Sequence, residues 1–273
     1  MKQILVATDF SKSAGNALSY ALAMAKTLGM EVVAIHAIHP TEGINNSTYN
    51  AIFIESYYAN KRAALKEWAA NISQKDNLTD VKLETICDVG FLKTVITRHT
   101  ENNPVELLVM GITGATGISG IVGSNASMAV TKMRIPTLIV PLESSFANFP
   151  IITLATDYET VLSPKDVTAL SELLKASGTK KMQVLYVAEK SDELHIQTGE
   201  KRIRDLLPDI VIDFNYIHDS SAPNGIIDFI KSNHTDILCL VKHHHNIIYR
   251  LFTSSTVNQV MNKTVKAILV LHE

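Results

Sequence analysis

The chain has 273 residues, a length typical of two domains, and 46% of them are hydrophobic, which suffices for packed cores. Its formal net charge of −2 disfavours binding to nucleic acids or to acidic membrane surfaces, where a basic patch is expected. No apolar stretch approaches the roughly 20 residues that span a bilayer, and the first apolar run is too short for a signal peptide.

The two cysteines indicate a reducing compartment. Cys87 and Cys239 both lie in apolar, strand-like runs, and neither has a partner at metal-motif spacing. Buried thiols in a cytoplasmic protein are the simplest interpretation, and a disulfide between them is the alternative.

Two parts of the chain repeat one pattern. The run QILVATDFS at 3–11 matches IITLATDYE at 151–159, and both contain Ala-Thr-Asp followed by an aromatic residue. An amphipathic helix pattern follows each run and ends near Gly29 or Gly178, where glycine is common. Further along, VELLVMG matches TDILCLV, and IPTLIVP matches KAILVLH. The chain is therefore interpreted as a tandem repeat.

Each half predicts five strands that alternate with helices. In the first half we expect strands over about 2–8, 31–38, 81–87, 105–110 and 136–141, and helices over about 12–28, 50–75, 90–102 and 124–133. In the second half we expect strands over about 150–156, 181–187, 210–217, 236–241 and 267–271. Apolar strands alternating with amphipathic helices predict an α/β fold, with a parallel sheet covered on both faces. The expected domains are residues 1–143 and 149–273.

A glycine-rich stretch follows the fourth strand of the first half. The sequence MGITGATGISGIVGSNAS covers 110–127 and has glycine at every third position from 111 to 123, just before a helix that begins near Ser124. Glycine lets the backbone approach a ligand, and the free N–H groups of a helix start favour an anion. The stretch predicts a phosphate-binding loop, and a flexible loop without a ligand is the alternative. It is neither a P-loop nor a nucleophile elbow.

Asp9 ends the first strand and is expected to face this loop, because strands 1 and 4 flank the crevice of such a sheet. Its carboxylate can accept hydrogen bonds from a ribose or an adenine amine. The structural alternative is a helix cap, a role that Ser11 and Ser13 can also fill. Asp157 occupies the matching place in the second half, which lacks the loop, so part of the role is structural.

The second half replaces the glycines with larger residues. Val241 stands in place of Gly111, and His244 in place of Gly114. Side chains then fill the space that a phosphate would occupy. The run His243–His245 is interpreted as a surface loop rather than a metal site, because adjacent residues point in different directions.

The whole pattern resembles the universal stress protein family. The nucleotide-binding members carry G-x-x-G, nine residues and then G-S/T, whereas eight residues separate the matching glycines here. The segment IHAIHP resembles the family's second strand, whose end lies beside the adenine. The residues that match the motif and the first strand's end are Thr8, Asp9, Gly111, Gly114, Gly123 and Ser124.

The resemblance implies two flavodoxin-like (adenine nucleotide α-hydrolase-like) domains, each with a sheet of order 3-2-1-4-5. It also implies an adenine nucleotide, ATP or AMP, in the first half, with or without Mg²⁺. The shortened segment leaves open a preference for AMP or ADP, or an empty site. The implied nucleotide-binding residues are Thr8, Asp9, Ala37, Ile38, Gly111, Gly114, Gly123, Ser124 and Asn125.

In single-domain members of the family the fifth strands meet at a dimer interface. The apolar fifth strands here, Thr137–Val140 and Ala267–Leu271, predict the same pairing inside one chain, as an internal pseudo-dimer, and leave a further homodimer open. The favoured function is a nucleotide-binding stress or regulatory protein. An interaction module without nucleotide is the alternative. A slow ATP hydrolase is less favoured, because the sequence shows no general base or metal-ligand set, and we predict no catalytic residue.

Overall fold

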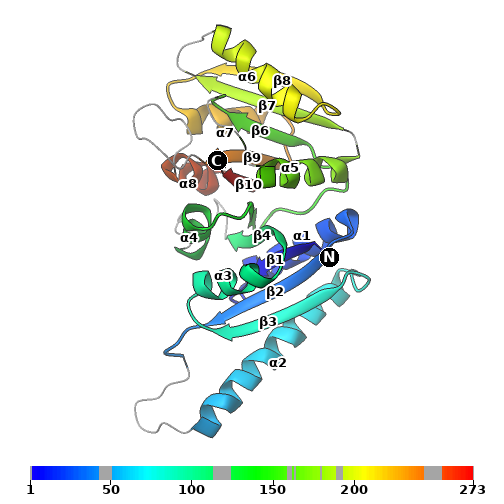
Figure 1. Ribbon diagram of the computed structural model, residues 1–273, viewed down its shortest axis with the longest axis vertical. Coiled ribbons are helices and arrows are strands. Elements are labelled where there is room, and N and C mark those ends of the chain that lie inside the picture. The colour runs from blue at the N-terminus through cyan, green and yellow to red at the C-terminus, as the bar shows by residue number, and fades with distance from the viewer. Residues whose placement is uncertain are drawn as a thin grey trace.

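The computed structural model describes residues 2–42, 51–112, 124–158, 162, 164–178, 180–188, 193–242 and 254–272. Strands and helices alternate along the chain (Figure 1). In the first half they are β1 (Gln3–Ala7), α1 (Lys12–Leu28), β2 (Glu31–Ile38), α2 (Ala51–Lys75), β3 (Leu83–Val89), α3 (Leu92–Asn102), β4 (Val105–Ile112), α4 (Ser124–Lys132) and β5 (Thr137–Pro141). In the second half they are β6 (Ile152–Thr156), α5 (Pro164–Ser177), β7 (Lys181–Ala188), α6 (Glu193–Leu206), β8 (Val211–His218), α7 (Ala222–Ser232), β9 (Ile237–Lys242), α8 (Ser254–Lys263) and β10 (Ala267–His272).

The strands form one sheet in the order β3-β2-β1-β4-β5-β10-β9-β6-β7-β8. Within each half the neighbouring strands are parallel, and the predicted order 3-2-1-4-5 is confirmed in both. The halves join where β5 and β10 pair antiparallel, with Leu138 opposite Leu269. This pairing satisfies the backbone edge that each fifth strand would otherwise expose.

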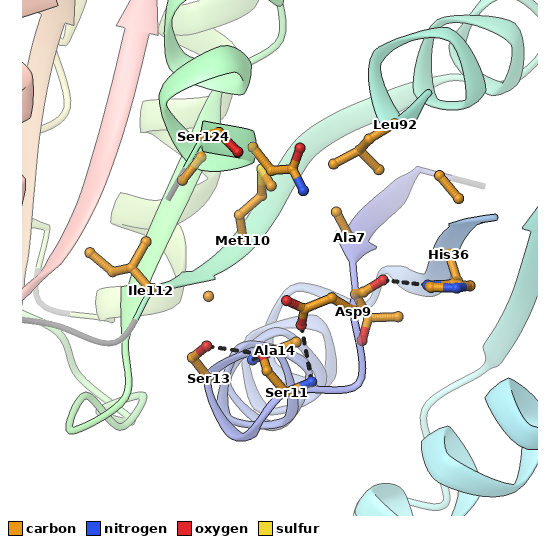
Figure 2. Close-up of a pocket in the computed structure, with 15 residues that line it drawn as sticks. Ala7, Asp9, Ser11, Ser13, Ala14, His36, Leu92, Met110, Ile112 and Ser124 are labelled. Atoms are coloured by element: carbon orange, nitrogen blue, oxygen red, sulfur yellow. Dashed lines mark hydrogen bonds between the residues drawn. The ribbon is translucent and has the colours of Figure 1, made fainter. Parts of the chain in front are cut away.

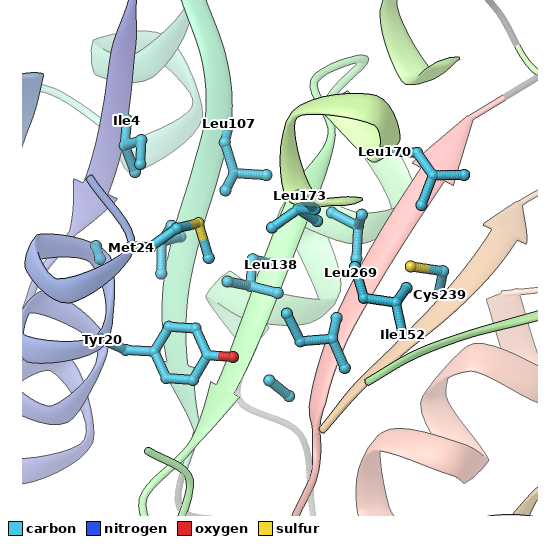
Figure 3. Close-up of a cluster of buried hydrophobic side chains, with 14 of the residues drawn as sticks. Ile4, Tyr20, Met24, Leu107, Leu138, Ile152, Leu170, Leu173, Cys239 and Leu269 are labelled. Carbon is cyan, nitrogen blue, oxygen red and sulfur yellow. The ribbon is translucent and has the colours of Figure 1, made fainter. Parts of the chain in front are cut away.

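Helices cover both faces of the sheet, as predicted. Apolar residues of α1, α5 and α6 pack on one face, and those of α3, α4, α7 and α8 pack on the other. Both faces of the central strands are therefore buried, which explains why these strands are continuous apolar runs rather than alternating ones. The hydrophobic cluster under α1, α5 and α6 is continuous across the junction between the halves (Figure 3).

Side chains of the first half contact the segment that connects the two halves and the second half itself. Tyr20 of α1 is buried and packs edge-on against Phe146 of the connecting segment, with ring centroids 5.4 Å apart. Asn16 donates its side-chain N–H groups to the carbonyl oxygens of Pro141 and Ser144, at 2.9 and 2.8 Å. Lys2 pairs with Glu172 of α5 at 3.3 Å. The helix α1 therefore contacts its own fifth strand and the connecting segment, and it also packs against α5 of the second half.

Most predicted boundaries lie close to the observed ones, but β3 begins and ends two residues later than expected. Val81 begins the apolar run, yet its N–H group donates to the carbonyl of Leu78 in a turn after α2. Pairing with β2 starts only at Leu83, opposite Val32. Val81, the first residue that the apolar pattern assigns to β3, therefore belongs to a turn that precedes the strand.

Candidate functional site

A cavity of about 390 Å³ lies where β1 and β4 end, between the starts of α1 and α4. This is the switch point of the first half, where the strand order reverses and where doubly wound sheets hold their ligands. Figure 2 shows Ser124 of α4 and Leu92 of α3 on one side, with Asp9, Ser11 and Ser13 on the other. The described residues that line it are Ala7, Thr8, Asp9, Ser11, Ser13, Ala14, His36, Ala37, Leu92, Met110, Gly111, Ile112, Ser124, Asn125 and Ala126.

Asp9 stabilises the turn that leads into α1. Its Oδ1 accepts the backbone N–H of Ser11 at 3.0 Å, while Ser11 itself is the N-cap and accepts the N–H of Ala14 at 3.2 Å. Ser11 therefore supplies the cap, and Asp9 supports it from two residues upstream. The carboxylate of Asp9 remains exposed beside the cavity, where it is available to a ligand.

Thr8 holds the end of β1 in place through each of its polar groups. Its Oγ1 accepts the N–H of Phe10 at 3.0 Å, and its carbonyl accepts Nδ1–H of the buried His36 at 2.8 Å. Phe10 has a left-handed φ of 65°, and its ring packs 4.7 Å from that of His36. The second half repeats the turn, since Oγ1 of Thr156 accepts the N–H of Tyr158, which has a φ of 62°. The repeated Thr-Asp-aromatic motif is thus a shared structural turn.

Two helices begin at the cavity. The start of α1 contributes Ser11 and Ser13, and the start of α4 contributes the exposed Ser124 and Asn125. Each helix N-terminus carries about half a positive charge and several backbone N–H groups without helical partners. An anion between the two helix starts is therefore favoured electrostatically, although Asp9 opposes it.

Gly111 allows α1 to lie against β4. A Cβ atom at this position would sit 2.1 Å from the carbonyl oxygen of Ser13 and 2.8 Å from the backbone nitrogen of Ala14. Both are backbone atoms, so no rotamer change can relieve the overlap. This glycine is therefore needed for the close approach of α1, independently of any phosphate.

The structure brings most of the predicted site residues together. Those that line the cavity are Thr8, Asp9, Ala37, Gly111, Ser124 and Asn125. Ile38 does not line it, because its side chain is buried with Leu65 and Cys87, and its carbonyl accepts the N–H of Gly90. Gly114 and Gly123 lie outside the described residues.

Sequence reasoning missed the apolar wall of the cavity. Leu92 begins α3, and Met110 and Ile112 end β4, and all three line the cavity. Met110 and Ile112 flank Gly111, so their position at the end of a strand beside the glycine stretch was the available signal. Leu92 gave no such signal, because only the packed fold brings the start of α3 next to β1 and β4.

The second half differs around the matching turn. Val241 stands in place of Gly111, and residues 243–253, the counterpart of the glycine stretch, lie outside the described residues. A void of about 20 Å³ beside Tyr158 lies under α6 and is lined by Gly199 and Arg202, so it is not the counterpart of the first-half cavity. The ring of Tyr158 stacks on that of Tyr186 at 4.8 Å. The connection to the next helix is also longer, since α5 begins only at Pro164.

Among the described residues, no group of three or more His, Cys, Asp or Glu side chains is arranged to hold a metal ion. His243–His245 lie outside the described residues. Both cysteines are free and buried, as predicted. Every helix among the described residues is too short or too polar to cross a membrane.

Comparison with known proteins shows the family of the chain. The profile of the Universal stress protein family matches residues 1–141, which is just over half of the chain. The chain belongs to this family. A curated relative, universal stress protein MJ0577 of Methanocaldococcus jannaschii, is 28% identical over 157 residues, covering 53% of this chain and 97% of the relative.

Solved structures extend the likeness in fold to both halves. A universal stress protein from Archaeoglobus fulgidus superposes with a TM-score of 0.75 at 16% identity, covering 99% of this chain and 98% of that one. Protein PA1789 of Pseudomonas aeruginosa, described as functionally unknown, superposes with a TM-score of 0.61 at 11% identity, covering 99% and 92%. The universal stress protein fold therefore spans the whole chain, including the half that the family profile does not match.

Proposed function

We propose that this chain is a stress-response or regulatory protein that binds an adenine nucleotide, ATP or AMP, in its first half. The observation that carries the proposal is the cavity at the switch point of the first half, lined by six of the predicted nucleotide-binding residues. The second half has the same turn, but larger residues replace the glycines, with Val241 in place of Gly111 and His244 in place of Gly114, so we assign no nucleotide to it.

The lining suggests a role for each part of the cavity. The apolar residues Ala37 and Leu92 would contact the base, and the exposed carboxylate of Asp9 would accept hydrogen bonds from the ribose. The phosphate would lie at the start of α4, where Ser124 offers a hydroxyl and a helix N-terminus. If Mg²⁺ accompanies the phosphates, Asp9 is the carboxylate of the lining that would face it.

A second candidate function is an interaction module that acts without nucleotide. The antiparallel pairing of β5 with β10 supports it, because two halves with the proposed bounds 1–143 and 149–273 would then form an internal pseudo-dimer. Further homodimers would then use surfaces other than the fifth strands. A slow ATP hydrolase is less favoured, and its test is phosphate release above a blank that a site mutation abolishes. A cytoplasmic location remains a prediction.

Calorimetric titration of nucleotide-free protein with ATP and with AMP tests the proposal. A Cβ branch in Gly114→Val should abolish binding while circular dichroism shows a folded protein. Ser124→Ala should weaken binding by less, since one neutral hydrogen bond contributes roughly 0.5–1.5 kcal/mol.

Ser254→Ala is the matched control, because Ser254 is the first residue of α8 as Ser124 is of α4. It should leave binding unchanged. No measurable binding by the wild-type protein would favour the interaction module. Equal affinities for wild type and a folded Gly114→Val variant would mean that the glycine stretch does not hold the phosphate.

A further inference from the structure

The sheet ends at β8, and the outer side of this strand has no partner among the described strands. The strand has eight residues, and the side chains of Val211 and Tyr216 are exposed. Its sequence VIDFNYIH contains no lysine, arginine, proline or glycine, and Asp213 is its only carboxylate. Edge strands commonly carry lysine, proline or a bulge that prevents pairing with another strand. β8 is therefore a long edge that is open to a further strand.

The opposite end of the sheet is better protected. The edge strand there, β3, carries two carboxylates, Glu84 and Asp88. It is also covered by α2, where Leu65 packs with Cys87 of β3 in one buried cluster. The covering helix α2 has 25 residues, whereas α6, which lies beside β8, has 14 (Figure 1). Of the two ends of the sheet, β8 is the one that the fold leaves open.

The hydrogen bonds to β7 determine which residues of β8 face outward. The N–H of Val211 donates to the carbonyl of Lys180 at 2.8 Å, so the backbone groups of Val211 point towards β7. Successive residues of a strand alternate in this direction, so every second residue directs its N–H and C=O groups away from β7. The outward-facing residues are Ile212, Phe214, Tyr216 and His218.

A second copy of β8, running antiparallel, matches these outward-facing residues in one register. With Asn215 on the twofold axis, Phe214 lies opposite Tyr216 of the second copy, and Ile212 lies opposite His218 of the second copy. Each such pair exchanges two backbone hydrogen bonds. A shift of two residues in either direction leaves some outward-facing groups of β8 without a partner. The backbone therefore selects the register that is centred on Asn215.

The side chains in this register are complementary in charge. On the α6 face, the guanidinium of Arg204 lies 4.5 Å from the ring centroid of Phe214, and the Tyr216 hydroxyl donates to Glu200. Because Phe214 lies opposite Tyr216 of the second copy, Arg204 of each chain would face Glu200 of the other. Within one chain this pair is 3.0 Å apart and Arg204 is still largely exposed, so the dimer would join two ion pairs into a network. On the other face the two Asn215 amides meet, and each can both donate and accept a hydrogen bond.

We propose that two copies of this chain associate through β8, antiparallel about a twofold axis at Asn215, so that one sheet continues through both chains. The occupant of this edge is a second copy rather than an unrelated peptide, because the surface is complementary to itself, as a twofold interface requires. The backbone pairs, the Arg204–Glu200 contacts and the Asn215 contact all occur twice or lie on the axis. This association does not require a bound nucleotide.

A disulfide cross-link tests the register. The two Asn215 residues would form a non-hydrogen-bonded antiparallel pair, whose Cα atoms lie about 4.5 Å apart, a distance that a disulfide can span. Asn215→Cys should therefore give a disulfide-linked dimer on a non-reducing gel after mild oxidation. Cys87 and Cys239 are buried and should not react. Asp213→Cys is the matched control, because it lies on the same face of β8 but its two copies would be about 14 Å apart, so it should not cross-link.

Sedimentation velocity over a concentration series measures the association of the full chain without a covalent bond. We expect a monomer–dimer equilibrium for the wild type. Arg204→Glu, which places like charges opposite each other, should raise the dissociation constant of the dimer about tenfold or more, or about 1.4 kcal/mol. The double variant Arg204→Glu with Glu200→Arg should restore the dimer. Glu84→Lys, in the opposite edge strand β3, should leave it unchanged.

Circular dichroism of each variant confirms that it is folded. A wild-type chain that stays monomeric at every concentration would overturn the proposal, as would cross-linking of Asp213→Cys as efficient as that of Asn215→Cys. Species larger than a dimer would show instead that β8 of one copy pairs with β3 of the next in an open chain. A dimer that Glu84→Lys dissociates and Arg204→Glu does not would place the interface at β3.

Discussion

The most informative single substitution is Gly111→Ala, because two accounts of this glycine make different predictions. A phosphate-loop glycine on a flexible segment tolerates a methyl group without loss of stability. The structure instead places the new Cβ 2.1 Å from the carbonyl oxygen of Ser13, whereas real Cβ contacts essentially never fall below 3.0 Å. The first turn of α1 must therefore move by about 0.9 Å relative to β4.

Overpacking of this kind lowers the free energy of unfolding by about 1–3 kcal/mol. For a chain of this size we expect a fall in melting temperature of about 2–4 °C for each kcal/mol. Differential scanning calorimetry of the ligand-free protein measures this fall. Because Ser11 and Ser13 move with α1, nucleotide affinity should fall as well, so lost binding in a Gly111 variant would not by itself demonstrate a phosphate contact.

Gly15→Ala is the matched control, since it makes the same change within α1. A Cβ at Gly15 would meet only Ile72 at 3.6 Å and Trp68 at 3.9 Å, which are ordinary contacts. Replacing a helix-interior glycine by alanine is worth up to about 1 kcal/mol, so this variant should be unchanged or more stable. A melting temperature for Gly111→Ala equal to that of the wild type would refute the steric argument.

Three further predictions concern stability. Asn16→Ala removes two hydrogen bonds to the carbonyls of Pro141 and Ser144 and should lower the free energy of unfolding in urea by about 1–2 kcal/mol; an unchanged midpoint would contradict this. Leu269→Ala, at the fully buried contact between β5 and β10, should lower the free energy of unfolding by about 2–5 kcal/mol and lower the melting temperature of both halves in one calorimetric transition. A second half that melts separately would show that the halves are independent. Hydrogen bonds from Lys61 and Tyr57 hold the pKa of Glu42 at about 2, below its ordinary 4.5, so the stabilisation is present above pH 4.5 and lost as pH falls towards 2. Glu42→Gln should flatten this part of the acid-unfolding curve followed by circular dichroism, by less than about 1 kcal/mol because the pair is partly exposed, and an unaltered curve would contradict it.

Local sequence signals predicted the elements well where caps are strong. The helix α1 begins and ends where the sequence indicates, because Ser11 caps its start and Gly29 ends it with a left-handed φ of 65°. The strand order followed from the alternation of apolar strands and helices together with the family resemblance. The start of β3 was misplaced because a turn at Val81 satisfies a backbone group locally, which apolar periodicity does not detect.

The candidate site was predicted less completely, because several of its features depend on contacts between distant residues. Gly111 meets Ser13, almost 100 positions away in the sequence, so its steric role is visible only in the packed fold. Ile38 was assigned to the site from the end of its strand, yet its side chain lies in another cluster. Thr8 was assigned as a ligand contact, whereas its hydrogen bonds to Phe10 and His36 show a structural role as well.

A crystal structure of the chain grown with saturating AMP tests the central claim most directly, because it shows where the nucleotide lies. We predict AMP in the first half, between Asp9, Ala37 and the start of α4 at Ser124. Nucleotide beside His243–His245 in the second half, or an empty first-half cavity in crystals grown at saturating AMP, would contradict the claim.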